Sequence, residues 1–199
     1  MLSALKENMP YSASALAVLA VFYGIYFAKM AMQGRRGIRT DQIGRRKEKG
    51  LHMVELLMKA ATLIAPASQL ISVLSGWSCI NGRPRIIGFA IGVAGDLVFL
   101  ISVITMKDSW RAGIPDKDKT ELVTSGIYRY SRNPAFLGFD LQYIGVLILC
   151  FNPLTAASSL FAMVMLHLQI LQEERYLEHE FGTQYSEYRS HVLRYFGRH

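Results

Sequence analysis

The sequence predicts an all-α integral membrane protein with about five transmembrane helices. Three observations support this fold class. Of the 199 residues, 51% are hydrophobic and 19% are charged, and the mean hydropathy is +0.22, which is too apolar for a typical soluble domain. The chain also holds several apolar runs of the roughly 20 residues needed to cross a bilayer. Arginine and lysine gather in short segments between these runs, as they do in loops that orient membrane proteins.

The first apolar run, residues 11–32, is predicted to be a retained membrane helix because it is longer than a signal-peptide core and lacks a strongly basic segment ahead of it. In the following loop, 33–51, basic residues outnumber acidic ones, and such loops face the cytoplasm. The N-terminus is then expected outside. The net charge of +7 is explained by these orientation signals, so no nucleic-acid partner is expected.

The second and third apolar runs cover residues 52–74 and 85–106. In the second run, Glu55 and Lys59 are spaced i,i+4, which lets them pair on one helix face. The third run carries small residues that allow close helix packing in a membrane: Gly88, Gly92 and Gly95. These glycines can serve close contacts within the chain or between chains.

The polar segment 107–133 is predicted to be cytoplasmic, and its aromatic and apolar content favours a folded, functional loop over a disordered one. The fourth and fifth runs, 134–151 and 154–171, are separated by the turn dipeptide Asn152-Pro153 and should form a helical hairpin. Four polar residues in the cytoplasmic half of this hairpin are predicted to line a shared cavity: Asp140, Gln142, His167 and Gln169.

The tail after Leu171 is expected to continue the fifth helix into water until Gly182 interrupts it. Aromatic and apolar residues between Tyr185 and Phe196 recur at helical spacing, which predicts a second, amphipathic helix over that stretch. Five crossings place the C-terminus in the cytoplasm, on the same side as the 107–133 segment.

These two cytoplasmic segments carry complementary side chains. Arg132 and Arg194 can bind a carboxylate, while Glu173 and Glu174 can accept hydrogen bonds from an ammonium group or hydroxyls. Flat rings for a heterocycle and glycines for close backbone approach complete the set: Tyr128, Phe136, Gly126 and Gly138. The residues therefore suit a small zwitterion with an aromatic ring, or alternatively they form intramolecular Arg–Glu pairs that close this face. The histidines and cysteines show no ligand spacing, so no metal is expected.

The stretch LVTSGIYRYSRNPAFLG, the hydrophobic hairpin, and then EERYLEHEFGTQYSEY with a terminal RYF resemble the isoprenylcysteine carboxyl methyltransferase and phospholipid methyltransferase family of membrane enzymes. The resemblance covers about the last ninety residues. It implies S-adenosylmethionine as methyl donor, with Glu173, Glu174 and Arg194 in catalysis. The residues that it places around the cofactor are Leu122, Val123, Gly126, Ile127, Tyr128, Arg132, Asn133, Pro134, Phe136 and Gly138.

The resemblance also implies a division of the chain. Residues 1–106 would hold three membrane helices with the basic loop 33–51. Residues 107–199 would be the catalytic region: a cofactor loop 107–133, the hairpin 134–171 and a cytoplasmic C-terminal segment 172–199. Two positions depart from the family pattern, because Asn133 stands where histidine is usual and Phe136 where tyrosine is common. The first departure removes a titratable group.

The expected substrate is a lipid-like or prenylated molecule whose acceptor group is a carboxylate, an amine or a thiol. The protein is expected to contact membrane lipids in a prokaryotic plasma membrane or the endoplasmic reticulum. A carboxylate or thiolate acceptor needs no general base, whereas for an amine Glu173 or Glu174 could take the proton. Two alternatives stay open: an NADPH-dependent membrane reductase of the sterol-reductase type, and a membrane scaffold without catalysis.

Overall fold

The structure is a computed structural model that describes residues 2–42, 49–111 and 121–199. The middle parts of the predicted loops 33–51 and 107–133 lie outside these residues. The described residues form eight helical segments: α1 (Leu2–Arg35), α2 (Lys49–Ser75), α3 (Pro84–Met106), η1 (Lys107–Ser109), η2 (Gly126–Arg129), α4 (Pro134–Leu149), α5 (Pro153–Phe181) and α6 (Thr183–His191). The described residues contain no β-strand, which confirms the all-α class.

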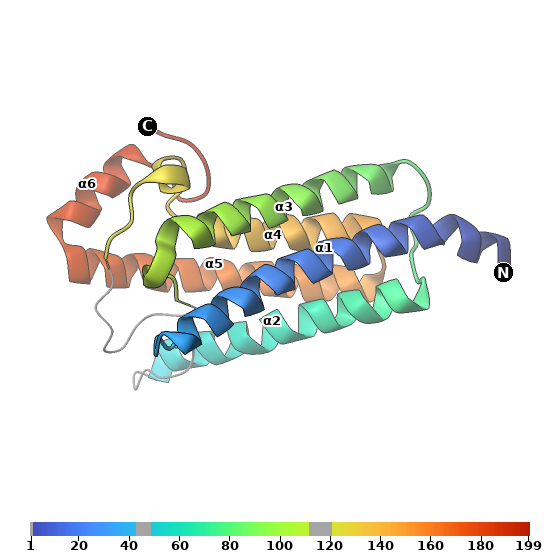
Figure 1. Ribbon diagram of the computed structural model, residues 1–199, viewed down its shortest axis with the longest axis horizontal. Helices are drawn as coiled ribbons and strands as arrows, with labels where there is room; N and C mark the ends of the chain where they lie inside the picture. The colour runs from blue at the N-terminus through green and yellow to red at the C-terminus, as the bar shows by residue number, and fades with distance from the viewer. Residues whose placement is uncertain (1, 43–48, 112–120) are drawn as a thin grey trace.

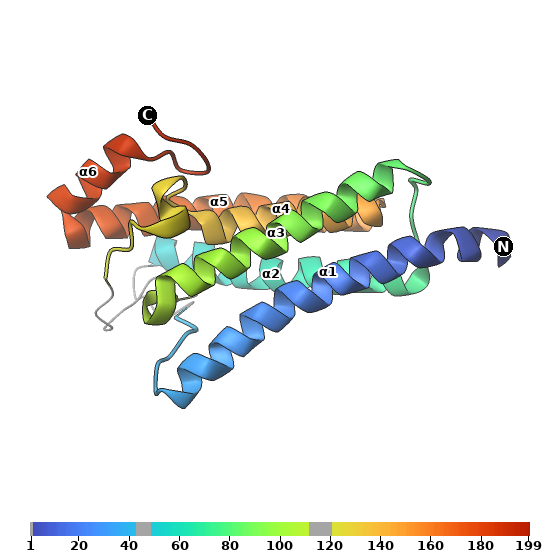
Figure 2. The same cartoon turned by 45° about the horizontal axis from the view of Figure 1, so that its top comes forward.

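The five long helices form one elongated bundle, and η2, α6 and the C-terminal residues gather at one end of it (Figure 1). We call this end the site end. Helix α3 packs mainly on α4, and α2 packs mainly on α5. Helix α1 lies against α3 and α4 but diverges from the rest of the bundle as it approaches the site end (Figure 2).

Within the described ranges, four helices are long and apolar enough to cross a membrane, with candidate spans Pro10–Arg35, His52–Ser75, Pro84–Ser109 and Pro153–Phe181. The remaining bundle helix, α4, is apolar but has only 16 residues. Large apolar side chains face outward from the bundle, for example Leu63 and Leu74, which are 65% and 69% exposed. Such an exposed apolar surface is what lipid contact requires, so the membrane-protein prediction is confirmed.

A seam of glycines holds α3 against α4, a close contact that the small residues of the third run allow. A Cβ atom added to Gly95 would lie 2.7 Å from the backbone nitrogen of Gln142, and one added to Gly138 would lie 2.8 Å from the Cβ of Phe99. Gly145 meets the backbone of Gly92 even more closely. The two helices can approach this closely only because these positions lack side chains.

The turn at Asn152-Pro153 is confirmed. Asn152 caps α5 by accepting a hydrogen bond from the backbone of Thr155 at 3.0 Å, while the Thr155 hydroxyl accepts one from the backbone of Asn152 at 3.1 Å. This reciprocal capping box fixes where the fifth helix begins. The returning helix is tied to α2 by a hydrogen bond of 2.6 Å between Ser68 and Ser158.

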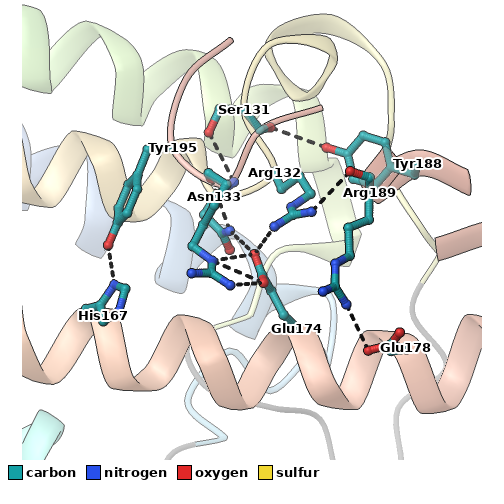
Figure 3. Close-up of polar contacts among 10 residues, drawn as sticks. Ser131, Arg132, Asn133, His167, Glu174, Glu178, Tyr188, Arg189 and Tyr195 are labelled. Carbon is teal, nitrogen blue, oxygen red and sulfur yellow. Dashed lines mark hydrogen bonds and ion pairs between the residues drawn. The ribbon is translucent and has the colours of Figure 1, made fainter. Parts of the chain in front are cut away.

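Three of the four polar residues of the hairpin bond to separate partners. Gln142 donates to Gln69 at 3.2 Å, and Gln169 donates to Glu173 at 3.1 Å. His167 bonds to the phenol of Tyr195 at 2.6 Å (Figure 3). The buried Oδ1 of Asp140 has no hydrogen-bond partner among the described residues, and none of the four residues lines the two pockets described below, so a cavity shared by them stays a prediction.

Two local predictions also need correction. Lys59 does not pair with Glu55, which is fully buried; its ammonium group lies 3.2 Å from Asp41, on the segment that follows α1. In the tail, Gly182 ends α5 as predicted, with φ of +50°, but α6 ends at His191. From Val192 the chain is extended and folds back on itself, with an antiparallel bridge between Val192 and Arg198.

Candidate functional site

A buried carboxylate, Glu174, lies at the centre of the site end and binds three side chains from separate parts of the sequence (Figure 3). Arg132 donates to its Oε1 at 2.9 Å, and Asn133 Nδ2 donates to the same oxygen at 3.0 Å. Arg194 donates to both oxygens from Nε and to Oε2 from Nη2, at 2.9 to 3.2 Å. We call these four residues the Glu174 cluster. It joins the entrance of α4, the end of α5 and the C-terminal tail.

The backbone between η2 and α4 presents Arg132 and Asn133 to this carboxylate. Tyr188 on α6 donates its hydroxyl to the carbonyl of Tyr128 at 2.7 Å, and the Ser131 hydroxyl accepts the backbone N–H of Asn133 at 3.1 Å. Below them, the buried phenol of Tyr128 bonds to Ser102 of α3 at 2.9 Å. The loop is therefore fixed from α3 on one side and from α6 on the other.

The tail adds backbone hydrogen bonds to the same loop. The N–H of Arg132 donates to the carbonyl of Leu193 at 3.1 Å, and the N–H of Gly197 donates to the carbonyl of Tyr130 at 2.7 Å. Asn133 Nδ2 also reaches the carbonyl of Arg194 at 3.2 Å. The tail is thus built into the site.

Electrostatics agree with this geometry. The hydrogen bonds to Glu174 raise the pKa of the Arg194 guanidinium above its usual range. Burial raises the pKa of the Tyr128 and Tyr188 phenols above their ordinary value, because a phenolate there would lose its hydration. Arg194 therefore stays charged, and the Tyr128 and Tyr188 phenols stay neutral, at physiological pH.

A pocket opens beside the Glu174 cluster, between the described parts of the 107–133 segment, the entrance of α4, the end of α5 and α6. Its wall is mostly apolar and aromatic with a few charged groups, which is typical of small-molecule sites. The lining residues that matter below are Trp110, Leu122, Val123, Tyr128, Arg132, Asn133, Phe136, Glu173, Tyr176 and Tyr188. We call this space the inner pocket.

A second pocket, with about 1080 Å³ of empty space, lies between α1, α2, α4 and α5, where α1 diverges from the bundle. We call it the lateral pocket. Its lining is dominated by large apolar and aromatic side chains from the apolar helices: Tyr23, Tyr26, Phe27, Met30, Met58, Leu63, Phe139 and Leu166. Both pockets are lined by Trp110, Arg111, Ala135, Phe136 and Glu173, which form a shared wall between them.

Trp110 is fixed in this shared wall from behind. Gln33 donates to its backbone carbonyl at 2.9 Å, and its ring packs edge-on against Tyr26 and Phe99 with centroid distances of 5.5 and 6.1 Å. Glu173 accepts a hydrogen bond from Gln169 one turn earlier on α5. The wall thus consists of a rigid aromatic part and a carboxylate.

The structure separates the site residues predicted from sequence into three groups. Seven line the inner pocket: Leu122, Val123, Tyr128, Arg132, Asn133, Phe136 and Glu173. Glu174 and Arg194 belong to the Glu174 cluster, with Arg132 and Asn133 in both groups. Four shape the backbone instead: Gly126 turns against Thr105 with φ of +60°, Ile127 accepts hydrogen bonds through its carbonyl, Pro134 begins α4, and Gly138 packs on Phe99.

Several lining residues were missed. Tyr176 and Leu177 are three and four residues after Glu173, so helical spacing alone could have placed them on the same face. Tyr188 was noted only as part of an aromatic stripe. Trp110 and Arg111 had no signal in the sequence, because their role depends on how α3 ends beside α1.

Comparison with known proteins agrees with this architecture. The model of the isoprenylcysteine carboxyl methyltransferase family matches residues 87–179. A probable protein-S-isoprenylcysteine O-methyltransferase from Oryza sativa subsp. indica is 27% identical over 180 residues, which cover 88% of this chain and 90% of the rice protein. Protein-S-isoprenylcysteine O-methyltransferase B from Arabidopsis thaliana is 31% identical over 110 residues, 53% of this chain and 55% of that protein.

The solved structure of the eukaryotic intramembrane Ras methyltransferase, an isoprenylcysteine carboxyl methyltransferase, superposes with a TM-score of 0.63. The match covers 94% of this chain and 66% of that chain at 21% identity, and it shows a common fold. The family match spans α3 to α5, which carry the shared wall and Glu174. The family model, the rice relative and the solved structure thus agree that this chain is similar to isoprenylcysteine carboxyl methyltransferases.

Proposed function

We propose that this chain is an integral membrane methyltransferase that uses S-adenosylmethionine to methylate the carboxylate of an isoprenylcysteine. The observation that carries this proposal is the shared wall: a pocket with polar and aromatic lining meets an apolar pocket at Phe136 and Glu173. The names of the matched relatives support isoprenylcysteine as the acceptor, and S-adenosylmethionine is the methyl donor that the family resemblance implies.

The inner pocket has the chemistry that S-adenosylmethionine requires. Tyr128, Tyr176 and Tyr188 offer aromatic surfaces for the adenine ring, and Glu173 offers a negative charge for a cationic molecule. The Nε atom of Arg132 is buried and has no hydrogen-bond partner among the described residues, so this lining residue keeps one donor for a carboxylate. When bound, S-adenosylmethionine supplies a methyl group on a positively charged sulfur.

The lateral pocket suits the greasy part of the acceptor. Its apolar lining comes from bundle helices, and it lies where α1 leaves the bundle. A prenyl chain can exchange lipid contacts for these side chains, while its head group meets the shared wall. An amphiphilic acceptor and a water-soluble cofactor can thus approach one point from two pockets.

The reaction needs little acid–base help from the chain. A carboxylic acid is ionised at neutral pH, because its ordinary pKa is about 3 to 4, so the acceptor is already a nucleophile. Asn133 in place of histidine is therefore no obstacle. Residues of the shared wall, Trp110 and Phe136, exclude water and hold the two reactants in line, which is where most of the rate enhancement is expected.

We further propose that the site end faces the cytoplasm, because α1 ends there and the basic segment begins at the end of α1. The division at residue 106 separates the proposed roles only in part. Inner-pocket residues come from 106 onward, whereas α1 and α2 build much of the lateral pocket. The first part of the chain is therefore proposed to bind the acceptor.

The test uses the purified full chain in lipid nanodiscs. We expect saturable binding of S-adenosylmethionine and no binding of NADPH. With isotope-labelled methyl donor, mass spectrometry should find the label as a methyl ester on a prenylcysteine lipid. Binding of NADPH in place of S-adenosylmethionine, or label only on amine lipids, would contradict the proposal.

Phe136 provides a matched pair of variants, because its ring lines both pockets. Phe136→Ala opens the shared wall and should lower kcat at least about tenfold, the scale of losing positioning at a reacting centre. Phe136→Tyr keeps the ring and should retain activity within about threefold. Equal activity of all three proteins would show that the shared wall is not where the reaction takes place.

A further inference from the structure

One charged pair in the lateral pocket has no role in the mechanism above. Lys59 of α2 and Asp41, on the segment after α1, both line this pocket, and their side chains are 3.2 Å apart. Around them the lining is mainly aromatic and aliphatic. An ammonium group among such side chains is a natural binding point for an anionic head group.

The pair is formed by a long-range contact although a nearer acid was available. Glu55 lies one turn before Lys59 on α2 but is fully buried. Asp41 instead reaches Lys59 from a segment that is anchored in place: Thr40 donates to Gln33 at 2.7 Å, and Gln33 donates to the carbonyl of Trp110 at 2.9 Å. The fold therefore holds a carboxylate at this pocket between α1 and α2.

The pair is also easy to displace. The Lys59 and Asp41 side chains are 46% and 43% exposed, and ion pairs with such exposure contribute little to stability. Lys59 has three ammonium hydrogens, and Asp41 is its only side-chain partner among the described residues. A second carboxylate can therefore share or replace the first at small cost.

We propose that Lys59 binds the carboxylate of the acceptor and that Asp41 pairs with Lys59 when no acceptor is bound. This inference rests on the proposed function. It names the residue that would favour a carboxylate over the amine and thiol acceptors that the sequence left open. A carboxylate head group gains the ammonium of Lys59, whereas an amine head group is repelled by it. Lys59 is a specificity-determining residue in this scheme.

The other charges around the lateral pocket fit this assignment. Arg111 lies in the shared wall, and its Nη1 donates to the carbonyls of Asp108 and Trp110, which fixes its position. Glu173, in the same wall, is an anion and cannot attract a carboxylate. Lys59 is therefore the cation of this lining that can bind a carboxylate, because its partner Asp41 is exposed and can be displaced.

The experiment measures acceptor binding without methyl donor. The probes are an N-acylated S-prenylcysteine and its carboxamide, which differ only in the ionised group. They are titrated into the purified full chain and the variants Lys59→Gln, Asp41→Asn and Glu178→Gln. Glu178→Gln is the matched control, because Glu178 pairs with Arg189 at 3.1 Å with 49% and 48% exposure but lines none of the pockets described above.

We expect the unmodified chain to bind the carboxylate at least about tenfold more tightly than the carboxamide, the scale of a charge-assisted hydrogen bond. Lys59→Gln should remove this preference and leave carboxamide binding unchanged. Asp41→Asn should strengthen carboxylate binding by up to about fivefold, the upper range for an exposed pair. Glu178→Gln should match the unmodified chain.

A carboxylate preference that survives Lys59→Gln would overturn the assignment of Lys59. Weaker or unchanged carboxylate binding in Asp41→Asn would overturn the competition by Asp41. Thermal unfolding and S-adenosylmethionine binding of each variant show that the fold and the inner pocket are intact. Failure of the proposed function would be seen separately, as absent methyl transfer by the unmodified chain.

Discussion

Glu173 and Glu174 are neighbours on α5, yet they serve two different regions of the molecule. Glu174 is 5% exposed and accepts hydrogen bonds from Arg132, Asn133 and Arg194. Glu173 lies in the shared wall of two pockets. Successive residues of a helix point about 100° apart, so two adjacent carboxylates cannot serve one site equally.

The Glu174 cluster has a structural role, whereas the shared wall borders the pockets proposed to bind ligands. In the Glu174 cluster both carboxylate oxygens are engaged by side chains of the protein, and the result is a joint between α4, α5 and the tail. In the shared wall, Glu173 and Arg111 line two pockets that a ligand can fill. A buried ionic network in which every charge is paired indicates a structural role. Charged residues that line a pocket indicate a binding role.

The strongest test of this contrast is Glu174→Gln. Removing the charge leaves Arg132, with a side chain 8% exposed, without its counter-ion, so we expect a loss of about 3 to 5 kcal/mol in the free energy of unfolding. Denaturant unfolding in detergent micelles measures it. Glu178 lies on the same helix as Glu174 and forms an exposed ion pair with Arg189 of α6. The Glu178→Gln variant should lose no more than about 1 kcal/mol in the free energy of unfolding.

Equal losses in the two variants would mean that the Glu174 cluster is not the joint described above. The Arg194→Lys variant refines the result, because lysine keeps the charge but cannot make the forked contact with both carboxylate oxygens. Its stability should fall between those of Glu174→Gln and the unmodified chain.

A smaller effect of a different kind is expected for Glu173→Gln. Its stability should change by less than about 1 kcal/mol, while the affinity for S-adenosylmethionine should fall about tenfold, equivalent to about 1.4 kcal/mol. S-adenosylhomocysteine lacks the positive charge on sulfur and is the matched ligand; its affinity should fall less. If both ligands weaken equally, Glu173 acts on some other part of the cofactor.

Tyr188 lies between the two regions, since it lines the inner pocket and also holds η2 through the carbonyl of Tyr128. Tyr188→Phe keeps the ring and removes the hydroxyl that donates to the carbonyls of Tyr128 and Ser131, so we expect about 1 kcal/mol less stability and cofactor affinity within about twofold. Equilibrium unfolding and cofactor titration measure the two effects. A large loss of affinity with unchanged stability would place Tyr188 in the binding site alone.

The pH dependence follows from the same phenols. Burial raises the pKa of Tyr128 and Tyr188 in the folded chain, so the unfolded chain releases these protons first. The stability that they contribute is complete below about pH 10 and is lost as the pH rises above it. Tyr188→Phe should show a shallower decline above pH 10 than the unmodified chain.

Much of the fold was predictable because the length and the apolar composition of membrane helices can be read directly from the sequence. The apolar runs and the turn at Asn152-Pro153 appear as predicted, and the glycines of α3 make close contacts within the chain. The end of α6 was not predictable from spacing: the residues after His191 keep a helical pattern but bind the backbone of the Arg132 loop instead. Contacts in tertiary structure outweighed local periodicity there.

The candidate site was predictable in its members but not in their division. Arginine and glutamate at one membrane face indicated a polar site, and both alternatives inferred for it have a place: Arg–Glu pairing in the Glu174 cluster and pocket lining around Glu173. The lateral pocket could not be predicted, because Tyr26, Lys59 and Phe139 come from three helices far apart in the sequence.

The short length of α4 makes the thickness of the bilayer relevant to catalysis. At 1.5 Å per residue its 16 residues span about 24 Å, roughly 6 Å less than a hydrocarbon core of about 30 Å. Its glycine seam with α3 prevents it from tilting independently. No residue of α4 is exposed, so its longer neighbours shield it from lipid, and the shared wall at its entrance can lie below the surface of the leaflet. This placement would bring the proposed reacting groups towards the depth of a prenylated head group.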